Sequence, residues 1–320
     1  MININYFSNS RLEFFDLTFY FINKIKSENK EKIKINILAP QSKLHILQSK
    51  IPNYPTLKIN LVTFPDGMYY INKLNYCMNL PEEYSIKLDE DCIVNNYIWD
   101  YMIENVNILD NDENLLLSPL LSTAFPACEF FIDKFLNRDQ RLTIVGHYLM
   151  QEMPNGLFGV DYSPLNSCTI NAVDWDYKAY FKALGELNTE KKGIHPLRIS
   201  YKGQIAINEF ILEKYEDICK KNEYNIMEIN TPYFTNNLFM MKTKLWKHIF
   251  ETGGGEYDEI GISNYKRANN KKFLFVDNGF GIHTFFNTCY GNNNPWGIGC
   301  VDAEEREKEF VEKLSKLIIK

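Results

Sequence analysis

Residues 83–94 read Glu83-Tyr84-Ser85-Ile86-Lys87-Leu88-Asp89-Glu90-Asp91-Cys92-Ile93-Val94. This strand-like run ends in three acids, and aliphatic residues follow them. Tyr84, Ile86 and Leu88 alternate with more polar residues, as expected of a β-strand. Carboxylates at the carboxyl end of such a strand project into the crevice where open α/β sheets bind ligands. Because Mg²⁺ and Mn²⁺ take oxygen ligands, often from carboxylates and substrate phosphates together, this stretch predicts a metal and nucleotide site.

Asp89 and Asp91 are two residues apart, so they would leave an extended strand on the same side. A D-x-D pattern alone is weak, since a chain of this length and Asp content shows about one by chance. Asp110-Asn111-Asp112 lies in a polar stretch typical of a turn, and Asp174-Trp175-Asp176 precedes a helix-like stretch, where an N-cap is the better interpretation. Only Asp89-Glu90-Asp91 has a predicted strand before it and a predicted helix, Asn95 to Asn107, behind it.

Composition indicates a globular protein of 320 residues with a formal charge of −6 and a sequence pI near 5.5. Because no block of Lys or Arg is long enough to follow a phosphate backbone, we expect no nucleic-acid partner. The seven cysteines are scattered, odd in number and lack a C-x-x-C pair, which favours reduced thiols in the cytoplasm. The start of the chain lacks the features of a signal peptide, and no apolar run reaches membrane-spanning length. We therefore expect no transmembrane segment. Peripheral contact with a membrane is compatible with this sequence.

Strands and helices alternate along the first third of the chain, which predicts an α/β fold with a mostly parallel sheet flanked by helices. No glycine-rich phosphate loop follows the first strand, which argues against dinucleotide-binding dehydrogenases and P-loop enzymes. Residues 122–230 read as irregular apart from a helix near residues 204–221. The expected strands are 2–7, 33–39, 56–64, 84–88, 234–241 and 272–276, and the expected helices include 11–26, 44–49, 69–79, 243–250, 258–269 and an amphipathic one within 301–320.

We expect one catalytic domain over residues 1–320. Its parts would be a nucleotide-binding half (1–118), an acceptor-side insertion (119–232), a catalytic and metal-completing segment (233–290), and a closing loop with a C-terminal helix (291–320).

With these residues assembled, the chain resembles the GT-A glycosyltransferases of the family-2-like kind, which move a sugar from a nucleotide donor with a metal at a D-x-D motif. The resemblance covers three separated patches: the first strand with Ser8-Asn9-Ser10-Arg11 and the helix of Asn72 to Tyr76, then Lys87 to Asp91, and finally Thr235 to His283 with its glycine turn. It implies a GT-A-like fold, Asp91 on the metal, and Asp89 near the nucleotide ribose. It also implies a late histidine, His283, as a second metal ligand, with second-shell or structural use as the alternative.

On the donor side we expect Ser8, Asn9, Arg11, Asp66, Lys73, Asp89, Glu90 and Trp296. Lys73 could reach donor phosphates, pair with Asp89 or lie on a solvated helix face. Trp296 lies in a glycine-containing stretch that reads either as a closing loop covering a sugar or as a rigid turn.

Inverting transfer needs a base for the acceptor hydroxyl, and Asp258 or Glu259 is the candidate. The alternative is that these acids favour the start of the following helix.

The expected activity is therefore transfer of a sugar from a nucleotide donor, UDP-linked by our expectation, to a glycan or other hydroxyl acceptor, with Mn²⁺ or Mg²⁺ as cofactor and inversion at the anomeric carbon. The alternatives are a nucleotidyltransferase on a related sheet and a non-catalytic carbohydrate- or nucleotide-binding protein. The oligomeric state is not predicted.

Overall fold

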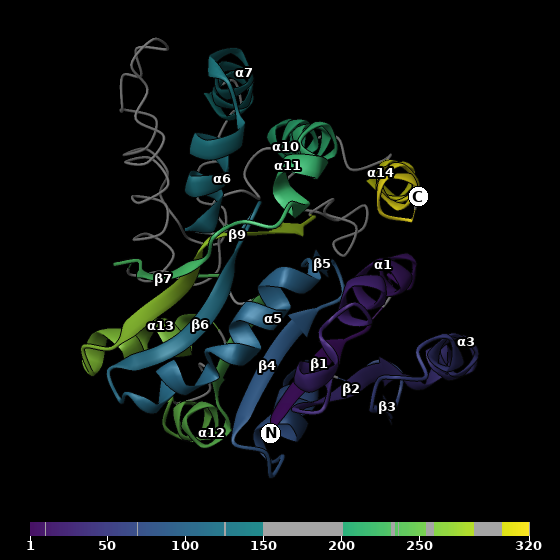
Figure 1. Cartoon of the computed structure of the whole chain (residues 1–320), viewed down its shortest axis with the longest axis vertical. Coiled ribbons are helices and arrows are strands. Elements are labelled where there is room, and N and C mark those ends of the chain that lie inside the picture. The colour runs from purple at the N-terminus through teal and green to yellow at the C-terminus, as the bar shows by residue number, and fades with distance from the viewer. Residues whose placement is uncertain are drawn as a thin grey trace. The chain divides into compact units, whose positions relative to one another are not determined.

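Figure 1 shows the computed structural model of the chain, which describes residues 1–9, 11–68, 70–124, 126–149, 201–231, 234–235, 237–253, 259–284 and 303–319. The chain divides into two compact units. The sheet unit comprises Met1–Leu120, Lys221–Asn230 and Asn236–Gly281, and the helical unit comprises Leu121–Lys220, Thr231–Thr235 and Ile282–Lys320.

The sheet unit holds the strands, two of which end in the helical unit. The strands are β1 (Ile2–Phe7), β2 (Ile33–Pro40), β3 (Ile59–Phe64), β4 (Tyr84–Asp89), β5 (Cys92–Ile93), β6 (Asn114–Leu121), β7 (Asn225–Glu228), β8 (Leu238–Lys242) and β9 (Lys272–His283). The helices of this unit are α1 (Glu13–Ile22), α2 (Ser27–Lys30), α3 (Leu44–Lys50), α4 (Tyr70–Met78), α5 (Asn96–Glu104), α12 (Thr243–Thr252) and α13 (Glu259–Ala268), with short 3₁₀ turns at Gln41–Lys43, Ile51–Asn53 and Val106–Asp110.

The sheet has the order β3-β2-β1-β4-β8-β6-β9-β5, with β7 paired to β9. β1 pairs in parallel with β2 on one side and β4 on the other, β2 pairs in parallel with β3, and β8 is antiparallel to β4. The prediction of an α/β fold with a mostly parallel sheet flanked by helices is confirmed. Because the chain winds from β1 outward to β3 and then returns to β4 on the other side of β1, the order reverses between β1 and β4. That is where doubly wound sheets open a crevice at their carboxyl ends.

One face of the parallel strands is apolar, as strand alternation requires. Ile4 and Tyr6 of β1 are fully buried. The Tyr6 ring makes edge-to-face contacts with Phe15 and Phe19 of α1, with ring centroids 5.9 and 5.4 Å apart. Such pairs add about 0.5 to 1.5 kcal/mol beyond area burial, so α1 is fixed under the carboxyl end of β1.

The opposite face is polar although it is buried. Asn36 donates to Asn5 at 3.0 Å, and Asn60 donates to Asn36 at 3.2 Å and to Tyr76 of α4 at 3.4 Å. These bonds pair several of the amide groups on this face, whereas the Asn5 amide nitrogen is buried and has no hydrogen-bond partner among the described residues. β1 is in register with β4, where Asn5 stands opposite Lys87, so the polar row continues into β4.

Several elements differ from the expected boundaries. The helix expected at 11–26 is shorter, because Lys26 is extended (φ −52°, ψ 145°) and its backbone N–H donates to Asp100 at 3.0 Å. β9 continues past Val276 to His283 through Asn278, which has a positive φ of 60°, a conformation that Asn tolerates better than most residues.

The helical unit contains α6 (Ala127–Phe135), α7 (Arg138–Leu149), α10 (Tyr201–Glu213), α11 (Tyr215–Cys219) and α14 (Ala303–Ile318), so residues 127–149 are regular where the sequence suggested irregular structure. α10 packs against both α7 and α14. The C-terminal helix is amphipathic, with Phe310, Leu314 and Ile318 buried. None of the helices in the described ranges is long and apolar enough to cross a membrane.

Candidate functional site

The loop after β1 and the turn after β4 lie side by side at the point where the strand order reverses. Phe7, the last residue of β1, is in register with Asp89, the last residue of β4. Glu90 and Asp91 form the turn that leads into β5. Asp91 therefore leaves a turn and not an extended strand, which changes the geometry expected for Asp89 and Asp91 while keeping both at the carboxyl edge of the sheet.

Arg11 forms an ion pair with Asp91, Nη1 bonding to Oδ2. The two side chains are 10% and 12% exposed. A guanidinium on a carboxylate is a strong, charge-assisted contact, and burial weakens its screening by water. The pair ties the start of α1 to the turn after β4.

Glu90 is also held by the β1 loop. The backbone N–H of Asn9 donates to Glu90 Oε2 at 2.7 Å, and the Tyr6 hydroxyl donates to the Glu90 carbonyl at 3.4 Å. Burial and the neighbouring charge of Glu90 raise the pKa of Tyr6, so its hydroxyl keeps its proton and acts as a donor. Glu90 is itself buried and thus serves to fix the loop.

Lys73 approaches the same loop from α4. Its ammonium donates to the Ser8 carbonyl at 3.2 Å and to Asn9 Oδ1. Burial lowers the pKa of Lys73, and the charges of Glu90 and Asp89 oppose that effect. The Ser8 hydroxyl is buried and makes no hydrogen bond within the part of the chain that the structure describes. Lys73 is buried, so it does not lie on a solvated helix face, which was one of the three alternatives for this residue.

Asp89 pairs with Lys87, whose ammonium lies 2.7 Å from Asp89 Oδ1. Burial raises the pKa of Asp89 to about 6. Lys87 opposes the rise, while the charges of Asp91 and Glu259 add to it. A carboxyl that titrates this close to neutrality, in a crevice with other acids, is typical of functional sites.

The remaining donor-side and catalytic candidates are spread over the sheet unit and the undescribed stretches. Asp66 Oδ1 accepts from the Ser42 N–H at 3.0 Å and is exposed, so it joins the loops after β2 and β3. Glu259 begins α13, and its charge acts on Asp89. Asp258 and Trp296 lie outside the described residues.

His283 ends β9 and is held by the loop after β6 in the helical unit. The Thr123 hydroxyl donates to the His283 carbonyl at 2.9 Å and lies 2.5 Å from Nδ1. A Thr123 hydroxyl that donates to the carbonyl leaves its oxygen to accept the ring proton from Nδ1. The lone pair of the imidazole is then on Nε2, the state in which histidine binds metal ions.

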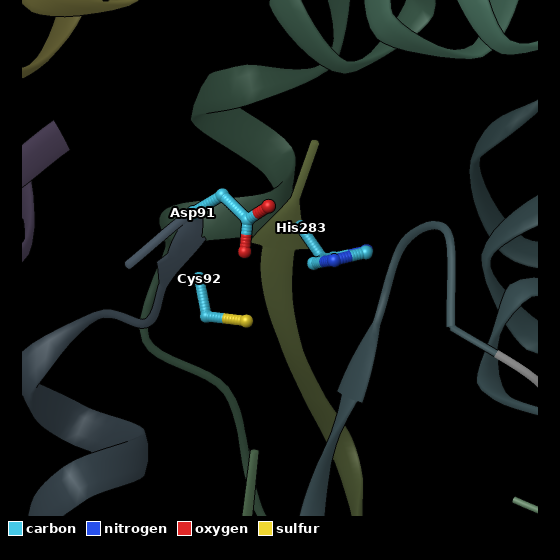
Figure 2. A group of neighbouring side chains, drawn as sticks. All are labelled: Asp91, Cys92 and His283. Carbon is cyan, nitrogen blue, oxygen red and sulfur yellow. The ribbon is translucent and has the colours of Figure 1, made fainter. Parts of the chain in front are cut away.

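Figure 2 shows the side chains of Asp91 and Cys92, which follow β4, and of His283 at the end of β9. The donor set in the sheet unit fits a hard divalent ion, since Asp89 and Asp91 offer carboxylate oxygens. Burial raises the pKa of Cys92, so its thiol keeps its proton in the metal-free protein. The described cysteines, Cys77, Cys92, Cys128 and Cys219, are all free thiols.

Lys87 and Thr123 contribute to the site without having been singled out from the sequence. Lys87 shares a strand face with Asp89, two residues away, so period-2 alternation places it beside the acid. The sequence pointed to Lys87 only in that a lysine occupies an inward position of a buried strand, where lysine is rare unless it is paired. Thr123 has no local signal, because its contact with His283 joins residues 160 positions apart.

No protein-family model and no curated protein matches the chain. Solved structures of glycosyltransferases do. The glycosyltransferase GlyE of Streptococcus pneumoniae TIGR4 is 16% identical over 37% of this chain and 29% of that chain, with a TM-score of 0.28. S. aureus TarS 1–349 is 8% identical over 98% of this chain and 72% of that chain, with a TM-score of 0.41. GalNAc-T7, solved with UDP, GalNAc and Mn²⁺, is 10% identical over 98% of this chain and 48% of that chain, with a TM-score of 0.47.

The matched region thus spans less than a third of the GlyE structure. The chain thus resembles solved structures of glycosyltransferases.

Proposed function

We propose that the protein is a metal-dependent glycosyltransferase that moves a sugar from a nucleotide donor to a hydroxyl acceptor. One observation supports this most: Asp89 and Asp91 leave the carboxyl end of β4 beside the loop after β1, where the strand order of the sheet reverses. Crevices at such reversals bind nucleotides in open α/β sheets.

The proposed centre uses Asp91 as a ligand of Mn²⁺ or Mg²⁺, with His283 as a second ligand through Nε2. A divalent ion there would stabilise negative charge on the phosphate oxygen of the leaving nucleoside diphosphate. Asp89 would orient the donor ribose by accepting hydrogen bonds from its hydroxyl groups. Among the described residues, Lys73 and Arg11 beside the loop after β1 would be the cations that meet donor phosphates.

A base must accept the acceptor hydroxyl proton as the new bond forms. We propose Glu259 or Asp258 for this step. Glu259 is the better supported of the two, because its charge adds to the rise in the pKa of Asp89. We further propose a UDP-linked donor and inversion at the anomeric carbon.

The proposal is tested by incubating the protein with a panel of UDP-, GDP-, dTDP- and CMP-sugars and Mn²⁺, and measuring nucleotide release with and without hydroxyl acceptors. The matched control is Asp112→Asn, an exposed acid of the D-x-D in the turn before β6. Release from a nucleotide sugar that Asp91→Asn abolishes and Asp112→Asn preserves supports the proposal. Pyrophosphate release from a nucleoside triphosphate would instead identify a nucleotidyltransferase, and metal-dependent binding without turnover a binding protein.

A further inference from the structure

The carboxylate on which the proposed metal site depends already has a cationic partner. Arg11 Nη1 bonds to Asp91 Oδ2, and both side chains are nearly buried. Arg11 precedes α1, whereas Asp91 follows β4, so the pair joins the two loops of the crevice. Lys87 forms an ion pair with a different acid, Asp89.

We propose that Arg11 is a built-in counter-ion that competes with the divalent cation for Asp91. This inference rests on the metal site of the proposed function. A guanidinium and a divalent ion repel each other, and little water separates charges at a nearly buried carboxylate. The ion binds Asp91 fully only when Arg11 moves away from Oδ2.

A nucleoside diphosphate relieves this competition. Its phosphates offer Arg11 an anionic partner of the geometry that a guanidinium binds best. When Arg11 turns to the phosphates, Asp91 becomes available to the metal. Metal and nucleotide binding are then coupled through this one side chain, and the coupling is reciprocal by thermodynamic necessity. Arg11 is a positioning residue in this scheme, since it sets the availability of Asp91.

The competition is measured by titrating MnCl₂ into the metal-free protein, with and without UDP, and following free Mn²⁺ by electron paramagnetic resonance. Arg11→Gln should bind Mn²⁺ alone at least about tenfold more tightly than the parent, a coupling of ordinary size. It should also lose most of the gain in Mn²⁺ affinity that UDP gives the parent. Arg11→Lys keeps the charge and should stay near the parent. Arg267→Gln, on exposed α13 surface, is the matched control.

A second measurement uses the unaltered protein and so does not depend on a variant that folds. The side-chain ¹⁵N signal of Arg11 should shift when Mg²⁺ is added to saturation, because the ion displaces the guanidinium from Asp91. An unmoved Arg11 signal at saturating Mg²⁺ would overturn the proposal.

The failures of the two proposals are distinguishable. If Arg11→Gln binds Mn²⁺ alone no more tightly than the parent while sugar transfer by the parent is normal, the competition is wrong and the proposed function survives. If the gain in Mn²⁺ affinity is present and is removed by adding Asp91→Asn, but no nucleotide sugar is turned over, the competition holds and the transferase assignment is wrong.

Discussion

Lys87 Nζ lies 2.7 Å from Asp89 Oδ1, and the Lys87 side chain is only 1% exposed. The ammonium also lies 5.5 Å from the ring centroids of Phe7 and Tyr70, so the charge is enclosed between these rings and the carboxylate. The pair sets the charge of the acid that ends β4. Burial raises the pKa of Asp89 to about 6, and Lys87 limits that rise.

The first prediction concerns the pH dependence of stability. The folded-state pKa of Asp89 lies above the unfolded value of about 3.9, so the folded protein holds this proton more tightly and loses stability as pH rises from about 4 to about 6. Asp89→Asn removes this loss. Its free energy of unfolding relative to the parent should therefore increase by roughly 1 to 3 kcal/mol between about pH 4 and about pH 7.

Urea denaturation at the two pH values measures this difference, and Asp112→Asn is the control for an exposed acid. A constant difference between Asp89→Asn and the parent across the range would show that Asp89 titrates at its ordinary pKa.

The second prediction is that Mn²⁺ and a nucleoside diphosphate bind interdependently at Asp91. Phosphate oxygens supply coordination positions that one carboxylate leaves open. Asp91→Asn removes a charged ligand and should lower transferase activity by at least about a hundredfold, the size of a single electrostatic contribution in an active site. Calorimetric titration of UDP with and without Mn²⁺ tests the interdependence. Near-parental, metal-dependent turnover by Asp91→Asn would remove the centre of the proposed function.

The third prediction concerns His283 and its partner. His283→Ala should weaken metal-dependent donor binding by about ten- to a hundredfold without unfolding the chain. Thr123→Val deletes the hydroxyl that fixes the ring through Nδ1, so it should lower metal affinity in the same direction by a smaller factor. Metal titrations that coincide for His283→Ala and the parent would assign His283 a structural role only.

The fourth prediction tests the close packing of Gly279 in β9. A methyl group at Gly279 would lie 2.5 Å from Val276 Cγ1 and 2.9 Å from Val276 Cβ, closer than packed atoms approach. Gly279→Ala should lower the free energy of unfolding by about 1 to 3 kcal/mol, the usual cost of overpacking. Adding Val276→Ala removes the clashing methyl groups and should make the Gly279→Ala step less costly. Equal costs in both backgrounds would show that the strand shifts to make room.

The sequence predicted the first strands and the place of Asp89-Glu90-Asp91 because these features are local. Alternation in Tyr84, Ile86 and Leu88 fixes the strand, and the acids that follow necessarily lie at its carboxyl end. Pro126 was less informative. The sequence suggested that this proline interrupts an irregular stretch, but it directly precedes α6, a position that proline tolerates.

The partners of the candidate residues could not be predicted in the same way. The contacts of Arg11 with Asp91 and of Thr123 with His283 join residues 80 and 160 positions apart. No periodicity records such a pairing, since it depends on how the strands are ordered in the sheet. The sequence therefore identified the acids, the histidine, Arg11 and Lys73 as candidates, but not the pairing of Arg11 with Asp91 or the contact of Thr123 with His283.

The last prediction is that the general base lies in the pair Asp258 and Glu259. Glu259→Gln and Asp258→Asn keep the shape of each side chain but cannot accept the proton. The variant of the true base should lose about a hundred- to ten-thousandfold in turnover with little change in donor affinity. If Glu259 only favours the start of α13, its amide costs at most about 1 kcal/mol of stability and leaves turnover near the parental rate.

Both quantities are needed: turnover from product formation, and donor affinity from UDP titration in the presence of Mn²⁺. The anomeric configuration of the product is the independent check, since a base that activates the acceptor for direct displacement inverts the anomeric carbon. Parental turnover in both single variants, or a retained configuration, would contradict the base assignment while leaving Asp91 and the nucleotide crevice in place. The charge of Glu259 acting on Asp89 makes Glu259 the variant to measure first.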